Sequence, residues 1–535
     1  MLNRWTEYCS ELYSYKASGD PSVLNCPQTD TEDDHPILRI EVEAAVQPLK
    51  TGKSAGVNNI PAELVQAGGE DVITALTTIC YKIWQTGKWP TPWTKSLVIT
   101  PPEDSNLQQC QNYRTMSLTS HPSRATLNII LSRLKPQEER IIAEEQAGFR
   151  AGRSTIEQIF NLRILCERYL QHQQDLFHVF IDFKKAFDRF LHEALWATIK
   201  KYNISTNLIQ VIKNLYNKAT SAVLFNSSIG DWFRTTAGVR QGCLLSPTLF
   251  NIFLERIMTD ALEDHEGSVS FGGKTITNLR FADDIDGLPG EEEGLANLVE
   301  HLDKASTAYG MEFSGEKTKV MTNTTSGINR EIKVNGQKFE TVTSFKYLGS
   351  VITDEGSKPE ILSRIAQTTA ALTRLKPVWI DKIRLMRSLV TSIFLYACES
   401  WTLTAELQRR IQAMEMGCYR KILHVSYKNH VTNEEVRAKI QQVIRPHEDI
   451  LTIAKRRKLQ WYGHVSRSLG LAKTILQDTV KGGRRQGREK KRWEDNIRER
   501  TSLEFGKPQR PVENRENGKK NWVQNHLWCP NDPRG

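Results

Sequence analysis

The chain has 535 residues, enough for two to four domains, and its 39% hydrophobic and 25% charged residues are typical of a globular enzyme. No apolar run reaches the ~20 residues of a membrane-spanning helix, and the first residues lack the apolar segment of a secretory signal. The nine cysteines show neither a CxxC pair nor a disulfide framework. We therefore expect no zinc knuckle, no membrane partner, and an intracellular protein of the nucleus or cytoplasm that is not secreted.

The N-terminal part is expected to begin loosely and then become helical. Residues 1–35 end in an acidic cluster and predict a loose segment, whereas residues 36–100 show helical patterns punctuated by prolines. Residues 155–170 predict an amphipathic helix. Residues 187–218 predict two helices that divide near residue 204.

Two strand ends in the middle of the chain carry aspartates. Residues 177–181 form a β-rich apolar run that places Asp182 at the C-terminal end of a buried strand, and residues 277–281 read as a strand leading into a turn at Asp283 and Asp284. Adjacent carboxylates repel each other and are costly to desolvate, so they persist where divalent cations neutralise them. A lone Asp-Asp pair is usually a solvated turn, but two such strand ends favour a two-Mg²⁺ site and a nucleic-acid polymerase.

A glycine-containing loop over residues 237–247 is expected to open the following helix. Its two glycines allow close approach to a ligand, and a helix start with Gln241 offers donors to a nucleotide or template strand. The other expected elements are strands over 221–240 and helices over 247–263, 292–309 and most of 358–466. The pattern predicts an α+β protein with a helical last third and a basic end.

The net charge of +10 is carried by the C-terminal end. Residues 451–500 hold 15 Lys and Arg against 5 Asp and Glu, and residues 501–535 hold 6 against 4. Cationic side chains interleaved with aromatic rings are typical of single-stranded nucleic-acid binding, whereas a solvated tail or an import signal gives the rings no role. The predicted nucleic-acid contacts are Lys455, Arg456, Arg457, Lys458, Trp461, Arg484, Arg485, Arg488, Lys490, Lys491 and Arg492.

Taken together, these segments resemble the reverse transcriptase of non-LTR (LINE-type) retrotransposons, from about residue 50 to about residue 500. Seven motifs match in the family's order: fingers motifs at 111–118 and 146–155, palm motifs at 180–188, 238–247, 281–284 and 315–319, and a primer-gripping hairpin at 345–349. The resemblance implies a right-hand polymerase fold of the α+β class. Its expected parts are fingers over 36–175, palm over 176–355, a helical thumb over 356–450, a basic nucleic-acid-binding region over 451–500 and a disordered tail over 501–535.

The resemblance also implies roles for single residues. Asp182, Asp283 and Asp284 would hold two Mg²⁺ ions, with Mn²⁺ able to substitute, and Lys317 would protonate the departing pyrophosphate unless it is a plain surface lysine. Phe187, five residues after Asp182, would exclude the 2′-hydroxyl of ribonucleotides unless it is an ordinary core residue. The remaining nucleotide-site residues would be Arg114, Gln241 and Gly242, and the primer grip would contain Tyr347, Leu348 and Gly349.

The implied activity is RNA-directed DNA polymerisation, a two-metal nucleotidyl transfer with an RNA template, a DNA primer and deoxynucleoside triphosphates. Elements of this type usually begin with an endonuclease domain, and no endonuclease motif fits in residues 1–50, so DNA nicking is expected to come from elsewhere. An acidic stretch at 101–104 occupies a fingers segment that is commonly lysine-rich. These departures indicate a fragment or a decayed copy. The alternatives are a catalytically silent nucleic-acid-binding remnant and a maturase-like RNA-binding cofactor.

Overall fold

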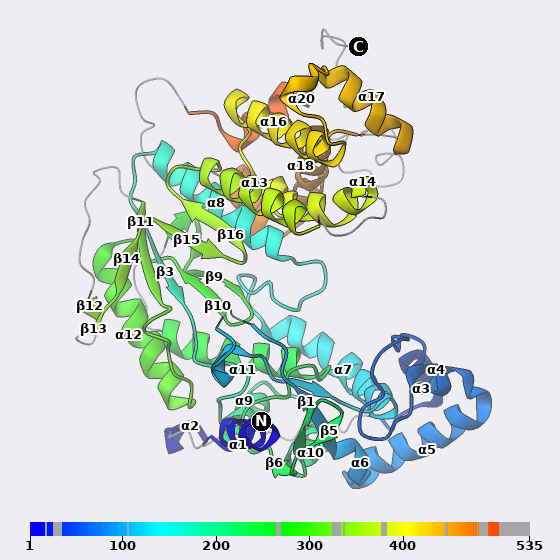
Figure 1. Cartoon of the computed structure of the whole chain (residues 1–535). Helices are drawn as coiled ribbons and strands as arrows, with labels where there is room; N and C mark the ends of the chain where they lie inside the picture. Colours follow the sequence, from blue (N-terminus) through cyan, green and yellow to red (C-terminus); the bar gives the residue numbers. More distant parts are fainter. Residues whose placement is uncertain are drawn as a thin grey trace. The chain divides into compact units, whose positions relative to one another are not determined.

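The computed structural model describes residues 1–15, 19–24, 35–103, 106–263, 269–323, 333–334, 337–375, 382–444, 448–478, 480 and 490–501. The chain divides into two compact units, each assembled from distant segments: unit 1 is Met1–Ala151, Ile181–Glu266 and Ala296–Thr318, and unit 2 is Gly152–Phe180, Gly267–Leu295 and Lys319–Gly535. Both units mix helices and strands, which confirms the predicted α+β class (Figure 1). This division cuts through the predicted palm, so the expected subdomain boundaries stay a prediction. None of the helices in the described ranges is both long and apolar enough to cross a bilayer.

Unit 1 contains a five-stranded sheet in the order β2-β1-β4-β5, with β6 paired to β4. β1 (Lys95–Ile99) runs antiparallel to β2 (Met116–Leu118) and parallel to β4 (Thr220–Phe225), and β5 (Ser228–Ile229) and β6 (Phe233–Arg234) are antiparallel to β4. The helices of unit 1 are α1 (Leu2–Tyr13), α2 (Pro21–Leu24), α3 (Arg39–Val46), α4 (Ala62–Ala67), α5 (Gly69–Thr86), α6 (Thr91–Thr94), α7 (His121–Ile141), α9 (His192–Lys201), α10 (Thr206–Asn217), α11 (Ser246–Leu262) and most of α12 (Glu292–Ala308).

The predicted loose N-terminus is wrong for residues 2–13, which form α1. Trp5, Cys9 and Tyr13 on one face of α1 pack in a core cluster with Val98 of β1 and Val223 of β4. The backbone carbonyl of Tyr13 also accepts hydrogen bonds from the amides of Thr236 and Ala237, at 2.8 and 3.2 Å. Mixed polar residues on the other face hid this helix from sequence reasoning.

Local signals in the sequence mark the starts of two helices of unit 1. α10 begins after Ser205, whose hydroxyl accepts from the amide of Leu208 at 3.4 Å, and this confirms the division of residues 187–218 into two helices. α11 carries Pro247 in its first turn, where a missing amide hydrogen costs nothing.

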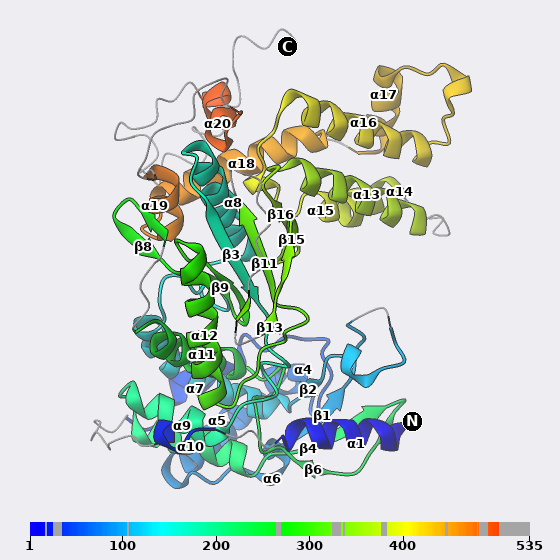
Figure 2. The ribbon, with the colours of Figure 1, turned by 90° about the vertical axis from the view of Figure 1, so that its left-hand side faces the viewer.

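Unit 2 contains the second five-stranded sheet, in the order β14-β11-β3-β10-β9. β3 (Leu176–Ile181) runs antiparallel to β11 (Lys319–Asn323), β11 runs parallel to β14 (Glu340–Val342), and β9 (Asn278–Phe281) forms a hairpin with β10 (Asp284–Gly287). α8 (Thr155–Gln171) contributes Phe160 and Leu165 to a core cluster that includes Phe180 of β3 and Leu279 of β9. Figure 2 shows α8 and these strands in side view.

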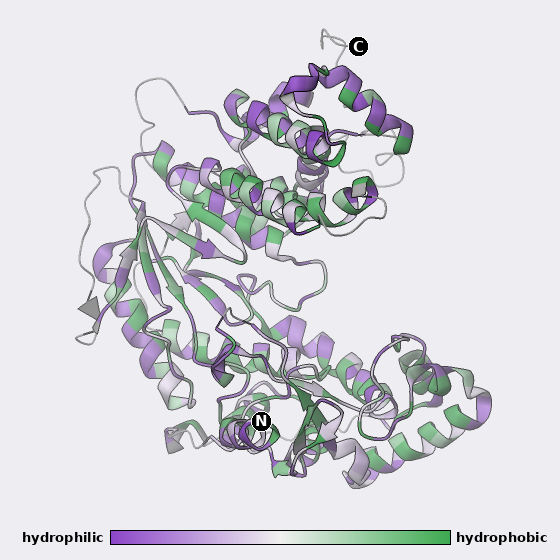
Figure 3. Cartoon of the chain, in the orientation of Figure 1, coloured by the Kyte–Doolittle hydropathy of each residue, from purple (hydrophilic) through white to green (hydrophobic). Residues whose placement is uncertain are grey.

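Short hairpins and a helical region complete unit 2. The hairpins are β7 (Val269–Phe271) with β8 (Lys274–Ile276), β12 (Lys333–Val334) with β13 (Gln337–Lys338), and β15 (Ser344–Tyr347) with β16 (Ser350–Thr353). The longer helices are α13 (Lys358–Arg374), α16 (Ala405–Ile422), α17 (Asn433–Val443), α18 (Ile450–Arg467), α19 (Leu471–Gln477) and α20 (Trp493–Thr501), with α14 (Lys382–Leu385), a π-helical turn (Met386–Val390) and α15 (Thr391–Phe394) between the first two. Polar and apolar residues alternate around α16 and α17 in Figure 3, as in helices with one buried face.

Candidate active site

The β9–β10 hairpin of unit 2 carries two adjacent aspartates at its tip. Phe281 pairs with Asp284 across the hairpin, so Ala282 and Asp283 alone form the turn. Ala282 is buried and takes a left-handed φ of 57°, Asp283 is half-buried and Asp284 is exposed. The predicted strand-to-turn arrangement of these aspartates is therefore confirmed.

Asp182 comes directly after the last residue of β3, as the sequence predicted. Within unit 1 its carbonyl accepts a hydrogen bond from the amide of Ser314 at 2.8 Å. The ammonium Nζ of Lys317 lies 3.5 Å from Asp182 Oδ2. Burial raises the pKa of Asp182, and the charge of Lys317 opposes that rise. Lys317, predicted to face pyrophosphate, thus pairs with a predicted metal ligand.

The chemistry of the three aspartates fits a divalent cation. Carboxylate oxygens are the ligands that Mg²⁺ and Mn²⁺ prefer, and Asp182, Asp283 and Asp284 offer no other donor type. Within the described ranges, no three His, Cys, Asp or Glu side chains are grouped as a metal site. The two-ion site therefore remains a prediction from chemistry and chain order.

Phe187 lies in an aromatic row of unit 1. Its ring stacks on Phe250 of α11, with centroids 4.2 Å apart and planes at 22°, and meets Phe149 edge-on at 6.2 Å and 87°. Phe187 is half-buried, whereas Phe250 is fully buried. A half-buried ring retains a solvent-facing part that a nucleotide sugar could contact. Phe187 is therefore compatible both with a role in excluding the 2′-hydroxyl and with an ordinary core position.

The loop around Gln241 is attached to the turn that carries Phe187. Gly238 has φ +63°, and a Cβ there would lie 2.5 Å from the carbonyl oxygen of Phe187, so only glycine fits. The amide of Val239 donates to that same oxygen at 2.7 Å. Gln241 is half-buried and Gly242 is exposed, with φ +96°. The two predicted nucleotide-site segments are therefore joined through their backbones.

Arg114 is exposed and forms an ion pair with Glu103, 2.8 Å from Nε to Oε1. Lys185 Nζ lies 3.8 Å from the other oxygen of Glu103. The acidic stretch at 101–104 therefore engages the arginine that the sequence assigned to the triphosphate, although Asp104 itself lies outside the described residues. Exposed pairs of this kind are worth only about 0–1 kcal/mol, so a triphosphate could displace Glu103.

The predicted primer grip is a tight hairpin between β15 and β16. Tyr347 is 2% exposed, and its hydroxyl donates to the carbonyl of Leu279 at 3.3 Å. Its assignment as a primer contact is wrong, because the ring lies in the core of unit 2. Leu348 and Gly349 form the turn with φ of 47° and 81°, and the hydroxyl of Tyr396 donates to the carbonyl of Leu348 at 2.7 Å. These two residues remain the accessible part of the grip.

The basic run at the start of α18 is more buried than its charge predicted. Lys458 is 2% exposed, and its Nζ donates to the carbonyl of Trp401 at 2.6 Å and to Asn496 Oδ1 at 2.9 Å. Burial lowers the pKa of Lys458 well below its usual range. Its assignment as a phosphate contact is wrong, because the ammonium group is enclosed. Trp461, predicted to stack on a base, packs edge-on against Phe160 at 5.8 Å.

The other cations of α18 and of the following basic run have protein partners or lie outside the described residues. Arg456 pairs with Glu448 at 2.8 Å, Arg457 approaches Glu399 at 3.9 Å, and burial lowers the pKa of Lys455 to about 8. Arg484, Arg485 and Arg488 lie outside the described residues. Lys490 is exposed, Lys491 pairs with Glu499 at 2.7 Å and Arg492 with Asp495 at 3.5 Å.

Sequence reasoning missed several residues that hold these segments. Asp188 is fully buried and accepts a hydrogen bond from Gln241. Glu138 is 0% exposed and lies at the centre of a polar network around residues 146–150. Trp493 is 0% exposed although it follows a highly charged run. Charged neighbours in sequence gave no signal that these side chains would be buried.

Comparison with known proteins shows which sequence family these segments match. The sequence family described as "Reverse transcriptase (RNA-dependent DNA polymerase)" matches residues 101–352. A Pol polyprotein from the type-1 retrotransposable element R2 of Nasonia vitripennis is 25% identical over 402 residues, covering 70% of this chain and 38% of that protein. The probable RNA-directed DNA polymerase from transposon BS of Drosophila melanogaster is 25% identical over 434 residues, covering 76% and 47%. The RNA-directed DNA polymerase from mobile element jockey of Drosophila funebris is 23% identical over 462 residues, covering 82% and 49%.

The chain spans half or less of the length of these curated relatives. Among solved structures, apo telomerase from Candida tropicalis is 14% identical and covers 77% of this chain and 74% of that one, with a TM-score of 0.38. Asp182, Asp283 and Asp284 all fall inside the family match. The chain therefore contains, at residues 101–352, a domain of the reverse transcriptase family similar to the polymerases of non-LTR retrotransposable elements.

Proposed function

We propose that the chain extends a DNA primer on an RNA template, as the polymerase of a LINE-type element. One observation carries the proposal. In the sheet of unit 2, β10, which starts at Asp284, is the neighbour of β3, and the residue after β3 is Asp182. Asp182 follows the end of β3, and Asp283 and Asp284 lie at the tip of the β9–β10 hairpin, all inside the reverse transcriptase match. Three such carboxylates are what a two-metal nucleotidyl transfer requires.

Asp182, Asp283 and Asp284 would hold the two divalent cations. When held there, Mg²⁺ would supply Lewis-acid chemistry for the attack of the primer 3′-oxygen on the α-phosphorus of a deoxynucleotide and for the departure of pyrophosphate. Lys317, whose Nζ lies 3.5 Å from Asp182 Oδ2, would give that pyrophosphate a proton. These roles extend the family assignment to single residues, and each role can be tested by substituting the residue.

The other predicted residues would contact the incoming nucleotide, the template strand or the primer strand. Phe187 would occupy the space of a ribose 2′-hydroxyl, Gln241 and Gly242 would contact the nucleotide or template, and Arg114 would leave Glu103 for the triphosphate. Leu348 and Gly349 would contact the primer strand. The RNA template, DNA primer and deoxynucleoside triphosphates imply an intracellular setting in nucleus or cytoplasm.

Primer extension by the purified chain on a primed RNA template tests the proposal. We expect extension with Mg²⁺ and deoxynucleotides, and a loss of about a hundredfold or more in Asp182→Asn and Asp283→Asn, since each removes a ligand charge from the cation site. RNA affinity should stay within about twofold, because the carboxylates do not attract phosphate. Near-parental extension by either variant would refute the assignment of these aspartates as metal ligands.

A catalytically silent remnant that binds nucleic acid is the second candidate. The ion pair between Arg114 and Glu103 favours it, because an acidic partner at this place weakens triphosphate binding. Glu103→Lys separates the two candidates. An active polymerase should then show a lower KM for deoxynucleotides, whereas a silent remnant should show RNA binding with no extension in either form.

A further inference from the structure

Phe149 combines a left-handed backbone conformation with an exposed ring. Its φ is +58°, a left-handed value that a bulky side chain rarely adopts, and its side chain is 48% exposed. Strained backbone of this kind persists where the surroundings enforce it, and it clusters at functional sites. A half-exposed ring gains only part of the stabilisation that full burial would give.

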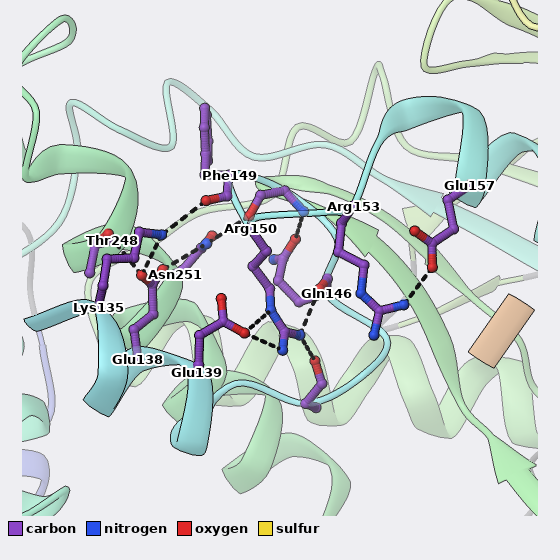
Figure 4. Close-up of polar contacts among 12 residues, drawn as sticks. Lys135, Glu138, Glu139, Gln146, Phe149, Arg150, Arg153, Glu157, Thr248 and Asn251 are labelled. Atoms are coloured by element: carbon purple, nitrogen blue, oxygen red, sulfur yellow. Dashed lines mark hydrogen bonds and ion pairs between the residues drawn. The ribbon is translucent and has the colours of Figure 1, made fainter. Parts of the chain in front are cut away.

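A polar network centred on the buried Glu138 holds the backbone of Phe149 (Figure 4). Lys135 Nζ donates to the carbonyl of Phe149 at 3.0 Å and pairs with Glu138 Oε2 at 2.7 Å. Asn251 Nδ2 donates to the carbonyl of Gly148 at 2.9 Å and approaches Glu138 Oε1 at 3.3 Å. Because Glu138 is 0% exposed, its charge is satisfied only while these partners stay in place, so the network is rigid.

Arg150 fixes the other side of the same turn. Its guanidinium donates to the carbonyls of Ala143 and Gln146, at 2.7 and 3.0 Å, and pairs with Glu139 at 2.9 Å. In Figure 4 the Phe149 ring points away from Glu139 and Arg150. The polar side of the turn is therefore anchored, and the aromatic ring is held on the opposite side.

The ring held in this way meets Phe187. Two aromatic rings contact Phe187: Phe149 edge-on at 6.2 Å and Phe250 in a stacked arrangement at 4.2 Å. Phe250 is fully buried, so the surrounding core packs against its ring. The Phe187 ring is thus restricted by contacts with a buried core ring and with a ring on an anchored turn.

We propose that Phe149 is a second specificity-determining residue of the sugar site, which acts by confining Phe187. The inference rests on the proposed function, since it concerns the choice between deoxyribonucleotides and ribonucleotides. Without Phe149, the Phe187 ring can turn about its χ1 and χ2 angles on one side and vacate the space of a 2′-hydroxyl. Phe149 also adds apolar surface beside that space, which further disfavours a hydroxyl.

Phe149→Gly tests this role without weakening the fold. Glycine adopts positive φ freely, so the variant relieves backbone strain, and its Tm should equal or exceed the parental value. The ratio of ribonucleotide to deoxyribonucleotide kcat/KM should rise roughly tenfold, as expected when apolar surface is removed from a specificity pocket. Phe149→Tyr should keep the parental ratio.

A double variant distinguishes confinement from an independent effect. Adding Phe149→Gly to Phe187→Ala should change the ratio by less than about twofold beyond Phe187→Ala alone, because residues in contact are not additive. Trp232→Ala is the control, since Trp232 is another exposed aromatic residue of unit 1 and lies over Lys95. It should leave the ratio unchanged.

The outcomes separate this inference from the proposed function. An active parental chain whose ratio is unchanged in Phe149→Gly, or fully additive in the double variant, overturns the role of Phe149 alone. A folded parental chain that extends no primer overturns the proposed function and this inference with it.

Discussion

Gln241 donates a hydrogen bond from Nε2 to Oδ2 of Asp188, 2.8 Å away. Asp188 is 1% exposed, and burial raises its pKa to about 7. Together with Gly238, which packs on the backbone of Phe187 and Asp188, this bond joins the predicted sugar gate to the predicted template loop. A single buried carboxyl group therefore orients the amide of Gln241.

Asp188 should make the stability of the fold depend on pH. Its folded pKa of about 7 lies above the ordinary value of 3.8, so the stabilisation is complete below about pH 4 and is lost as pH rises through 7. Asp188→Asn keeps an acceptor for Gln241 and removes the charge. Thermal unfolding of both proteins from pH 5 to 8 should show that the Tm of the variant rises relative to that of the parent as pH rises. Parallel curves would contradict the buried titration, and Asp231→Asn, at an exposed position, is the control.

Phe187→Ala should raise the incorporation of ribonucleotides relative to deoxyribonucleotides. Removing the ring vacates the space beside the sugar, and a change of roughly 10–200-fold is typical of such pockets. Single-nucleotide kcat/KM values on one primed template measure the ratio. An unchanged ratio in a protein with parental Tm would show that Phe187 is an ordinary core residue and does not select the sugar.

Trp493→Ala should destabilise unit 2 by about 3–5 kcal/mol, as expected for a fully buried aromatic residue. Trp493 packs against Phe160 at 5.0 Å, and its amide donates to Glu167 of α8. Denaturant unfolding gives the value. The same contacts predict that removing residues 451–535 abolishes folding of unit 2, whereas a chain ending after Thr501 should keep the parental Tm. A folded 1–450 chain would show that this packing is dispensable.

Replacing Arg484, Arg485 and Arg488 with Ser should weaken nucleic-acid binding and flatten its salt dependence. Removing one cation–phosphate interaction lowers the log–log slope by roughly 0.7–0.9, so removing three should change the slope by about 2–3. The control replaces Arg409, Lys428 and Lys439, which are exposed on other segments of unit 2. Equal slopes for the triple variant and the parent would show that the run does not bind phosphates.

The buried pair of His178 and Asp286 should show strong coupling. Their side chains are 0% exposed, with His178 Nδ1 3.2 Å from Asp286 Oδ2, and that carboxylate outweighs burial and raises the pKa of His178 to about 10. His178→Phe alone leaves a buried carboxyl group without its partner and should cost about 3–5 kcal/mol. His178→Phe with Asp286→Leu should recover most of that loss. Additive single effects in a denaturant double-mutant cycle would refute the pairing.

Sequence patterns predicted the parts of this protein that depend on short-range signals. The strand before Asp182, the turn at Asp283 and the helix that begins after Ser205 each follow from local periodicity and turn or cap chemistry. Burial of polar residues depends on partners far away in the sequence. From sequence, Lys458 looks like a surface cation, but in the fold its ammonium group is bound by Trp401 and Asn496. Likewise Tyr347 looks like an accessible hairpin residue, but its hydroxyl donates to a carbonyl of β9.

The interleaved construction of unit 2 has a consequence for its synthesis. Its core joins Phe160 to Trp493 and Ile497, and two long segments of unit 1 are inserted between its parts. At ~5–20 residues per second, a ribosome needs roughly 20–70 s to pass from Phe160 to Trp493. For most of that interval α8 and β3 have been made, while the apolar residues between Leu459 and Ile497 that pack in the same core have not. The nascent chain must therefore keep the uncovered apolar side chains of α8 from contacting other chains, and its dependence on chaperones should be greatest before α20 is made.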